Sequence, residues 1–344
     1  MSGARHGKRM ARETGSDTCP MGSANLLTIP AFGKWVELMT SCYSLIRPWA
    51  AGLLMTAVGL AVSCAKAKPT AGAVPPAVTA PTEQRYPLTG EIIEVQRASQ
   101  TLVVTHDEIR GYMPGMTMEF KAARGDLENA QPGQHIRAEL VVRGTEFFLD
   151  KIWPADAVTA RALAAAAQSL AQDTAMRGKS AYREIGETLP EFTLLDQTGR
   201  AVSPSRFRGK QVVLNFIFTR CPVATMCPAA TLRMQELQQA ARAAGVTDLE
   251  LVSISLDPEF DTPGVLKEYA EVRGIDLANF SFLTGPDAAV RQLLAQLGVI
   301  REFEGATIKH TLATVLINPQ GKIIYRADGS AWAVDDFVRR LKKA

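Results

Sequence analysis

The stretch VVLNFIFTRCPVATMCP, residues 212–228, contains the features that decide the fold of the larger part of this chain. Its first seven residues are β-branched, aromatic or otherwise almost continuously apolar, which is typical of a strand buried on both faces of a sheet. A helix is expected to follow, because Pro228 suits the first helical position. Cys221 and Cys227 are therefore predicted to lie at the carboxyl end of a buried strand, where open α/β sheets bind ligands.

The two thiols are expected to be reactive. Cys227 would occupy the cap of the helix, where unpaired amides and the helix dipole favour a thiolate, and Arg220 places a cation beside Cys221. Both effects predict lowered cysteine pKa values, and the thiolate is the form that attacks disulfides and binds metals. The alternative is a structural disulfide between the two cysteines with no further role.

His310 is the candidate third group of this site, among the four histidines of the chain. It lies in a segment that reads as strand, Asn-Pro-Gln-Gly turn and strand, so a hairpin is predicted over residues 308–325, with His310 at the entry of a core strand. The alternative is a solvated histidine at a loop end. Two thiolates and one imidazole are too few for a closed zinc site, whereas sulfur favours Cu(I) and added nitrogen also accommodates Cu(II). Copper is therefore the metal we expect.

Further motifs lie on both sides of the cysteine stretch, between Phe192 and His310. They are FTLLD at 192–196, VSISLDP at 252–258, DTP at 261–263, LKEYA at 266–270 and FLTG at 282–285. From Phe192 to the end, the chain resembles the SCO/SenC family of copper chaperones. The resemblance implies a thioredoxin-like fold for residues 183–344. It also implies copper ligands at Cys221, Cys227 and His310, and delivery of copper to the binuclear copper centre of a respiratory oxidase, in cytochrome c oxidase assembly.

The chain departs from the common family pattern in one respect, because five residues separate its cysteines instead of three. A longer loop could favour disulfide exchange. A thiol–disulfide oxidoreductase, with Cys221 attacking and Cys227 resolving, is therefore the alternative function, and enzyme activity stays open. Copper buffering for resistance is a third possibility. Ordinary thioredoxin-like oxidoreductases have a proline immediately before the strand that faces the thiols, and the Lys-His-Thr of residues 309–311 at that place favours metal.

Two acidic residues after the predicted strand at 252–256 admit two interpretations. Asp257 and Asp261 could support the metal or redox site from behind. The sequence Asp261-Thr262-Pro263 equally reads as a helix start with Asp or Thr as the cap, and the cap is the interpretation we favour.

Residues 85–154 read as a separate small all-β barrel, because short strands alternate with turn residues. This region contains Met113, Met116 and Met118 within six residues. Met116 and Met118 are two apart on a predicted strand, so both thioethers point to one face, and thioethers suit Cu(I). His106 can supply a nitrogen. The alternative is that these methionines fill the barrel interior.

The same region resembles the periplasmic CusF-like copper-binding domain, an OB-like barrel. In that family a histidine and a Met-Thr-Met pair bind Cu(I) or Ag(I) beneath a tryptophan. The matching positions here are His106 and Met116 to Met118. Met113 stands at the tryptophan position, so the aromatic cap is missing, and Met113 could contribute a further sulfur.

The remaining segments concern connection and export. Alanine-rich residues 155–182 predict a helical linker, a spacer of about 30 Å unless the helix packs against one domain. Residues 1–64 read as a leader whose apolar run ends at Cys64 and resembles a bacterial lipoprotein signal with Cys64 lipidated, and residues 65–84 form a Pro/Ala tether. A plain secretory signal and an uncleaved anchor are the alternatives, and Met39 is a candidate internal start. The lipoprotein signal, the secretory signal and the uncleaved anchor would all place the domains on the periplasmic side of a bacterial membrane.

Charge adds no further partner class. The net charge is +3 over 344 residues, without a basic block or a nucleotide-type Gly-rich loop, so no nucleic acid partner is expected. The sequence as a whole predicts an exported, lipid-anchored copper metallochaperone whose partner is an oxidase copper centre or another copper acceptor. Cu(I) would pass from the barrel to the cysteines, because thiolates hold it more tightly than thioethers.

Overall fold

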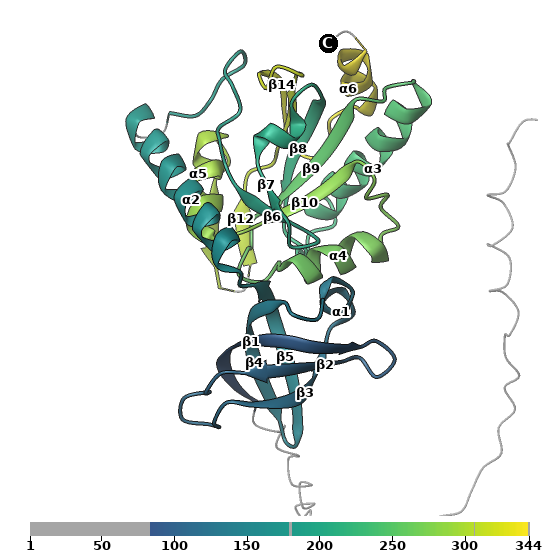
Figure 1. Ribbon diagram of the computed structural model, residues 1–344. Helices are drawn as coiled ribbons and strands as arrows, with labels where there is room; N and C mark the ends of the chain where they lie inside the picture. Colours follow the sequence, from purple (N-terminus) through teal and green to yellow (C-terminus); the bar gives the residue numbers. More distant parts are fainter. Residues whose placement is uncertain (1–82, 179–180, 306, 343–344) are drawn as a thin grey trace, which may run out of the picture. The chain divides into compact units, whose positions relative to one another are not determined.

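The computed structural model describes residues 83–178, 181–305 and 307–342, and the statements below concern those residues. The leader, Cys64 and nearly all of the tether lie outside them. In chain order the elements are β1 (Gln84–Gln96), β2 (Thr101–His106), β3 (Met116–Ala122), α1 (Arg124–Asn129), β4 (His135–Arg143), β5 (Glu146–Pro154), α2 (Ala157–Arg177), β6 (Leu194–Asp196), β7 (Ala201–Val202), η1 (Pro204–Phe207), β8 (Gln211–Ile217), α3 (Cys227–Ala243), β9 (Leu249–Ser255), α4 (Pro263–Val272), β10 (Phe280–Thr284), α5 (Asp287–Gln296), β11 (Arg301–Glu304), β12 (Thr307–His310), β13 (Ala313–Ile317), β14 (Ile323–Asp328) and α6 (Val334–Leu341) (Figure 1).

Strands β1 to β5 close into a small barrel in the order β1-β2-β3-β5-β4, as expected for an all-β module. Every second side chain of β2 and β3 points inward, and Leu102, Val104 and Phe120 form part of the buried core. The long strand β1 pairs with both β2 and β4 at Gly90. A Cβ atom there would lie 2.6 Å from the carbonyl oxygen of Thr105, so the strands can approach at this point only with glycine.

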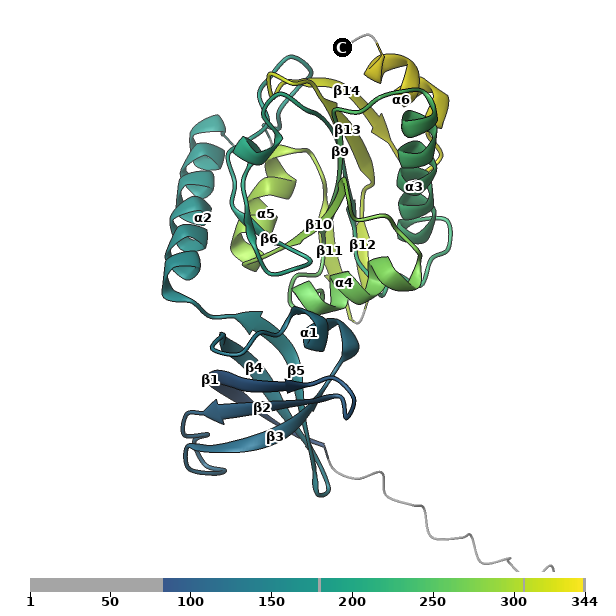
Figure 2. The same cartoon turned by 45° about the vertical axis from the view of Figure 1, so that its right-hand side comes forward.

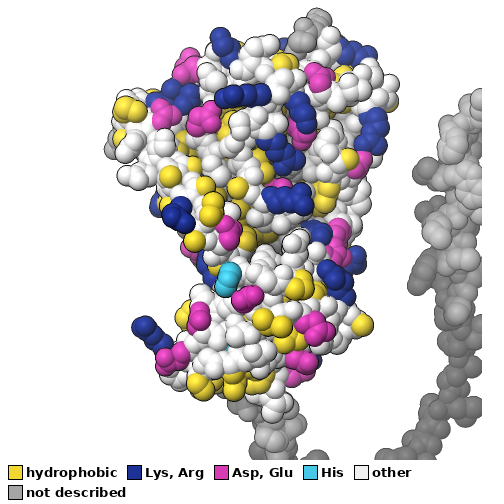
Figure 3. Space-filling view, in the orientation of Figure 1, with side chains coloured by type: hydrophobic (Ala, Val, Ile, Leu, Met, Phe, Trp, Pro, Cys, Tyr) yellow, Lys and Arg dark blue, Asp and Glu magenta, His cyan; other side chains and the backbone are white. Residues whose placement is uncertain are grey.

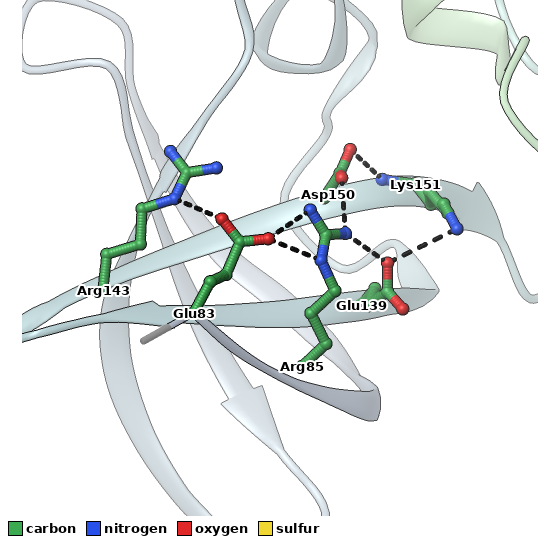
Figure 4. Close-up of polar contacts among 6 residues, drawn as sticks. All are labelled: Glu83, Arg85, Glu139, Arg143, Asp150 and Lys151. Carbon is green, nitrogen blue, oxygen red and sulfur yellow. Dashed lines mark hydrogen bonds and ion pairs between the residues drawn. The ribbon is translucent and has the colours of Figure 1, made fainter. Parts of the chain in front are cut away.

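Ion pairs tie three barrel strands together on their outer side (Figure 4). Arg85 of β1 donates to Glu139 of β4 at 2.6 Å and to Asp150 of β5 at 3.1 Å. Glu83 accepts from Arg85 and from Arg143, and Lys151 pairs with Glu139. Because these groups are partly exposed, each pair adds little stability, and the cluster acts mainly by fixing how β1, β4 and β5 meet.

A mixed sheet forms the centre of the C-terminal domain, in the order β14-β13-β8-β9-β10-β6-β7. Strands β8, β9 and β10 run parallel, and β13 is antiparallel to β8. Helices α3 and α6 lie on one face of this sheet and α5, backed by α2, on the other (Figure 2). The predicted thioredoxin-like fold is confirmed. The stretch at 212–218 is confirmed as a strand, and every residue of β8 is buried.

Helix α2 begins as the sequence predicts, since the side chain of its cap Asp156 accepts from the backbone N–H of Thr159 at 2.7 Å. It does not extend as a free spacer, however. The Gln296 amide of α5 donates to the Thr174 hydroxyl at 3.0 Å, and Arg183 pairs with Asp173 at 2.6 Å. The alternative interpretation, a helix packed against one domain, is therefore the correct one.

The predicted hairpin over 308–325 is only partly correct. The core hairpin is β13–β14 and begins at Ala313, whereas His310 ends β12, which pairs with β11 in a separate ribbon. The strand breaks at Thr311 because its backbone N–H and its hydroxyl both bond the backbone of Ile300, each at 3.0 Å. His310 is thereby placed beside the sheet rather than in it.

The surface carries both signs of charge. On the face drawn in Figure 3, Lys and Arg side chains are interspersed with Asp and Glu over the C-terminal domain. None of the helices in the described ranges is long and apolar enough to cross a membrane.

Candidate metal centre

The cysteine loop connects β8 to α3. Helix α3 begins at Cys227 itself, and Met226 occupies the cap position, so Cys227 is not the cap that the sequence suggested. Both cysteines carry free thiols, Cys221 half-buried and Cys227 fully buried. Burial raises the pKa of the Cys227 thiol far above its usual value, with the neighbouring Cys221 thiol adding to the effect. The expected lowering of the pKa is therefore wrong for Cys227, because its desolvation outweighs the helix dipole.

The three expected ligands converge. One donor atom each of Cys221, Cys227 and His310 lie within 4.8 Å of one another. Cys227 Sγ is 3.4 Å from His310 Nε2, and His310 Nδ1 is 3.1 Å from the carbonyl oxygen of Thr311. That carbonyl accepts a hydrogen bond from Nδ1–H, so the lone pair of the neutral ring lies on Nε2, which faces the sulfur. Burial lowers the pKa of His310, which favours this neutral, metal-binding form.

The five-residue spacing does not separate the thiols. The loop is folded on itself, since Met226 N–H bonds the Val223 carbonyl at 3.0 Å. From outside the loop, the Ser330 hydroxyl donates to the Thr225 carbonyl at 2.6 Å. Phe218 packs edge-on against the His310 ring, with 5.5 Å between centroids. The additional residues thus form a braced turn that still brings both sulfurs to the imidazole.

Three polar residues behind the loop, Asp257, Asp261 and Thr262, make different contacts. Thr262 is the N-cap of α4, with its hydroxyl 3.4 Å from the Val265 N–H, as one half of the cap interpretation predicts. Asp261 is not a cap: it accepts from the backbone N–H of Thr219 at 3.2 Å and from the Ser255 hydroxyl at 2.6 Å. Arg220 pairs with Asp257 at 2.7 Å. The favoured interpretation, a helix start with a cap in this sequence, is therefore confirmed with Thr262 as the cap. Asp261 and Asp257 make their contacts in addition to that cap.

A second group of soft donors lies in the barrel. His106 is buried, and its Nδ1 is 2.7 Å from the carbonyl oxygen of Asp107. Its Nε2 is also buried and has no hydrogen-bond partner within the described residues. Met116 lies directly opposite His106 in the β2–β3 pairing, and Met118 is two residues further along the same face. Met116 is 47% exposed, so the group opens to solvent.

Met113 lies in a tight turn of the same domain. Its backbone exchanges hydrogen bonds with Ile109, at 2.9 and 3.1 Å, and its side chain packs against the barrel core. The ring of Tyr112 stacks on Tyr86 with 4.5 Å between centroids, which holds the turn against β1. A buried ring nitrogen without a partner is costly, and a soft cation beside the thioethers would satisfy it. The donor set therefore fits the expected ion.

Fold and site together define a thioredoxin-fold protein with a two-cysteine, one-histidine centre at the end of its sheet, preceded by a small β-barrel. Residues 180–344 match the SCO1/SenC family model. The SCO1 protein homolog of Bacillus subtilis is 31% identical over 158 residues, which cover 44% of this chain and 80% of that protein. The chain belongs to the SCO1/SenC family.

Further similar proteins include a human protein and a solved bacterial structure. Human mitochondrial SCO2 homolog is 30% identical over 169 residues, 46% of this chain and 62% of that protein. A solved SCO1/SenC family lipoprotein from Bacillus anthracis is 27% identical, with a TM-score of 0.44, and covers 47% of this chain and 98% of its own. Residues 85–154 match the model of the copper binding periplasmic protein CusF. Both resemblances predicted from the sequence are confirmed, and the description of the second names the expected metal.

Proposed function

We propose that this protein is an exported copper metallochaperone, which carries copper on Cys221, Cys227 and His310 and delivers it to an acceptor protein. The convergence of these three donors within 4.8 Å is the observation that carries the proposal. The chain belongs to the SCO1/SenC family. The acceptor that the resemblance to this family implies is the copper centre of cytochrome c oxidase.

The protonation states suit a carrier that loads and unloads. The imidazole is neutral and ready to bind, whereas the buried Cys227 thiol keeps its proton until a cation takes its place. Loading therefore releases protons, and unloading takes them up again. Cys221 is only half-buried, so an acceptor can reach the ion from that side.

The barrel provides the second copper site of the proposal. His106 Nε2, Met116 and Met118 would hold Cu(I), with Met113 as a further sulfur where the family has tryptophan. The unpartnered buried Nε2 supports this assignment. Neutral thioethers hold Cu(I) less tightly than thiolates, so copper would move from the barrel to the cysteines.

The match to a periplasmic copper-binding model supports export of both domains to the periplasmic side. Lipidation at Cys64 would hold them at a bacterial membrane.

A thiol–disulfide oxidoreductase is the second candidate function. The half-exposed Cys221 and the buried Cys227 favour it, because this arrangement suits an attacking and a resolving thiol. Copper buffering is the remaining alternative, in which the barrel would be the principal site and no acceptor would exist.

An anaerobic titration of the reduced protein with Cu(I) tests these functions. We expect two equivalents to bind, one lost in the double variant M116L/M118L and the other in C221S/C227S. Transfer is then measured by loading copper and adding a soluble fragment of an oxidase copper domain. Disulfide reduction that persists in H310A, with no copper retained at the thiols, would establish the oxidoreductase instead.

A further inference from the structure

Two buried charged side chains outside the donor set hold the segments that carry the ligands. Asp261 is fully buried, and the Arg301 side chain is 6% exposed. Neither residue belongs to the three donors, and charged groups are rarely buried unless they are paired.

Asp261 anchors the cysteine loop. Its carboxylate accepts from the backbone N–H of Thr219 at 3.2 Å, from the Thr219 hydroxyl, and from the Ser255 hydroxyl at 2.6 Å. Thr219 lies two residues before Cys221, and Ser255 is the last residue of β9. The carboxylate thus joins the beginning of the loop to the end of the neighbouring strand.

Arg301 anchors the ribbon that carries the imidazole. It lies directly across from His310 in the β11–β12 pairing. Its guanidinium donates to the Leu256 carbonyl at 2.9 Å and to Asp287 at 2.7 Å. The ribbon is not part of the main sheet, so these bonds connect it to the end of β9 and to the first turn of α5.

Both anchors act on one short segment, residues 255–261, which follows β9 directly. We propose that Asp261 and Arg301 are positioning residues of the copper centre: Asp261 sets the place of the thiols, and Arg301 sets the place of the imidazole. The inference rests on the proposed function, since it assumes that copper is held by the three donors.

The physical reason is preorganisation. Three donors from two separate segments bind one ion tightly only if neither segment has to be ordered at the moment of binding. Removing the Asp261 carboxylate leaves the Thr219 N–H and two hydroxyls without their acceptor, so the loop relaxes. Losing a group that orients metal ligands typically lowers metal affinity by about 10- to 100-fold.

The two variants should lose different copper ligands, whereas general destabilisation would affect all three ligands alike. In D261A the sulfur shell around bound copper should weaken and the nitrogen shell should remain. In R301M the nitrogen shell should weaken while both sulfurs stay. Each variant should lose about tenfold or more in copper affinity. D261N should recover part of the loss, because an amide oxygen can still accept from the Thr219 N–H.

Matched controls are available in the same domain. Glu250 is a buried carboxylate at the other end of β9, bonded to Lys210 at 2.6 Å, and Arg183, whose side chain is 12% exposed, pairs with Asp173. E250A and R183M therefore remove similar charges whose bonding partners lie outside the cysteine loop and the β11–β12 ribbon. T219V, which removes only one hydroxyl, serves if D261A does not fold.

The experiment measures Cu(I) affinity of the full chain by competition with a chromophoric chelator, and the ligand shells by X-ray absorption. All variants are made in protein that also carries M116L/M118L, so that the measured copper binding comes from the cysteine site alone. Wild-type affinity and shells in D261A and R301M would overturn the inference, as would equal losses in the control variants. Absence of copper at the thiols in the background protein itself would instead refute the proposed function.

Discussion

Cys227 Sγ lies 3.4 Å from His310 Nε2, although 83 positions separate the two residues in the chain. The sulfur comes from the first turn of α3 and the nitrogen from the end of the β11–β12 ribbon. Both segments are hydrogen-bonded near the end of β9, the cysteine loop through Asp261 and the ribbon through Arg301. The contact brings a fully buried thiol next to the free lone pair of a neutral imidazole, a pair that a soft cation can bridge.

Replacing that imidazole should separate the two oxidation states of copper. In H310A two thiolates remain, which still suit Cu(I), whereas Cu(II) loses the nitrogen donor that stabilises it. We expect the thiolate-to-Cu(II) absorption band to disappear and the Cu(I) affinity to fall by about tenfold or more. H135A, which removes an exposed histidine at the start of β4, is the control and should bind as the wild type does. An unchanged Cu(II) spectrum in H310A would remove His310 from the donor set.

The barrel site can be tested without disturbing the packing. Leucine replaces methionine at nearly constant volume, so M116L/M118L should cost less than about 1.5 kcal/mol in stability. It should nevertheless abolish binding of Ag(I), a redox-inert probe for the barrel, as measured by calorimetry in C221S/C227S protein. M234L, at a buried methionine of α3, should leave Ag(I) binding unchanged. Full Ag(I) binding in M116L/M118L would mean that the methionines only fill the barrel.

Much of this architecture could be predicted from local sequence. The apolar run before the cysteines encodes β8, and the alternating pattern upstream encodes the barrel strands, because both depend on neighbours within a few residues. The same reasoning identified His310 and the methionines. These candidate ligands can be recognised from their residue type and their position in the chain, without knowing which strands pair with one another.

The errors share one cause, which is packing between distant segments. The Cys227 pKa was predicted from the helix dipole, whereas burial among core residues decides it. The strand at His310 was assigned to the core hairpin, because nothing in residues 308–310 shows that they pair with residues 301–304. The sequence leaves open whether Asp261 or Thr262 caps α4, and only the packing shows that Thr262 is the cap while Asp261 accepts from the Thr219 N–H. No local pattern marks Arg301.

A buried acid in α1 should make stability depend on pH. Burial raises the pKa of Asp126 to about 7 from the usual 3.8, and the carboxylates of Asp150 and Glu268 add to the effect. The folded state therefore keeps the proton at a pH where the unfolded chain has lost it. The free energy of unfolding is therefore highest below about pH 4, where both the folded and the unfolded state hold this proton. It falls by an amount on the order of 4 kcal/mol as the pH rises to about 7.

D126N should remove this dependence, since asparagine carries no titrating proton. The free energy of unfolding, measured with urea at several values between about pH 4 and pH 8, should fall less steeply in D126N than in the wild type. D335N, at an exposed position of α6, is the control and should retain the wild-type slope. Equal slopes in D126N and wild type would show that Asp126 ionises freely in the folded protein.

The brace on the longer cysteine loop gives the last prediction. The Ser330 hydroxyl donates to the Thr225 carbonyl at 2.6 Å, and it comes from the segment between β14 and α6. In S330A the loop loses this bond, worth about 1 kcal/mol, so its open form should become about fivefold more populated. Cys227 should then be alkylated several-fold faster in the copper-free protein, and copper should leave the loaded protein faster, while the melting temperature changes little. S205A, at an exposed serine of η1, controls for the loss of a hydroxyl elsewhere. Identical alkylation and release rates in S330A would show that the five residues between the cysteines hold their shape without the brace.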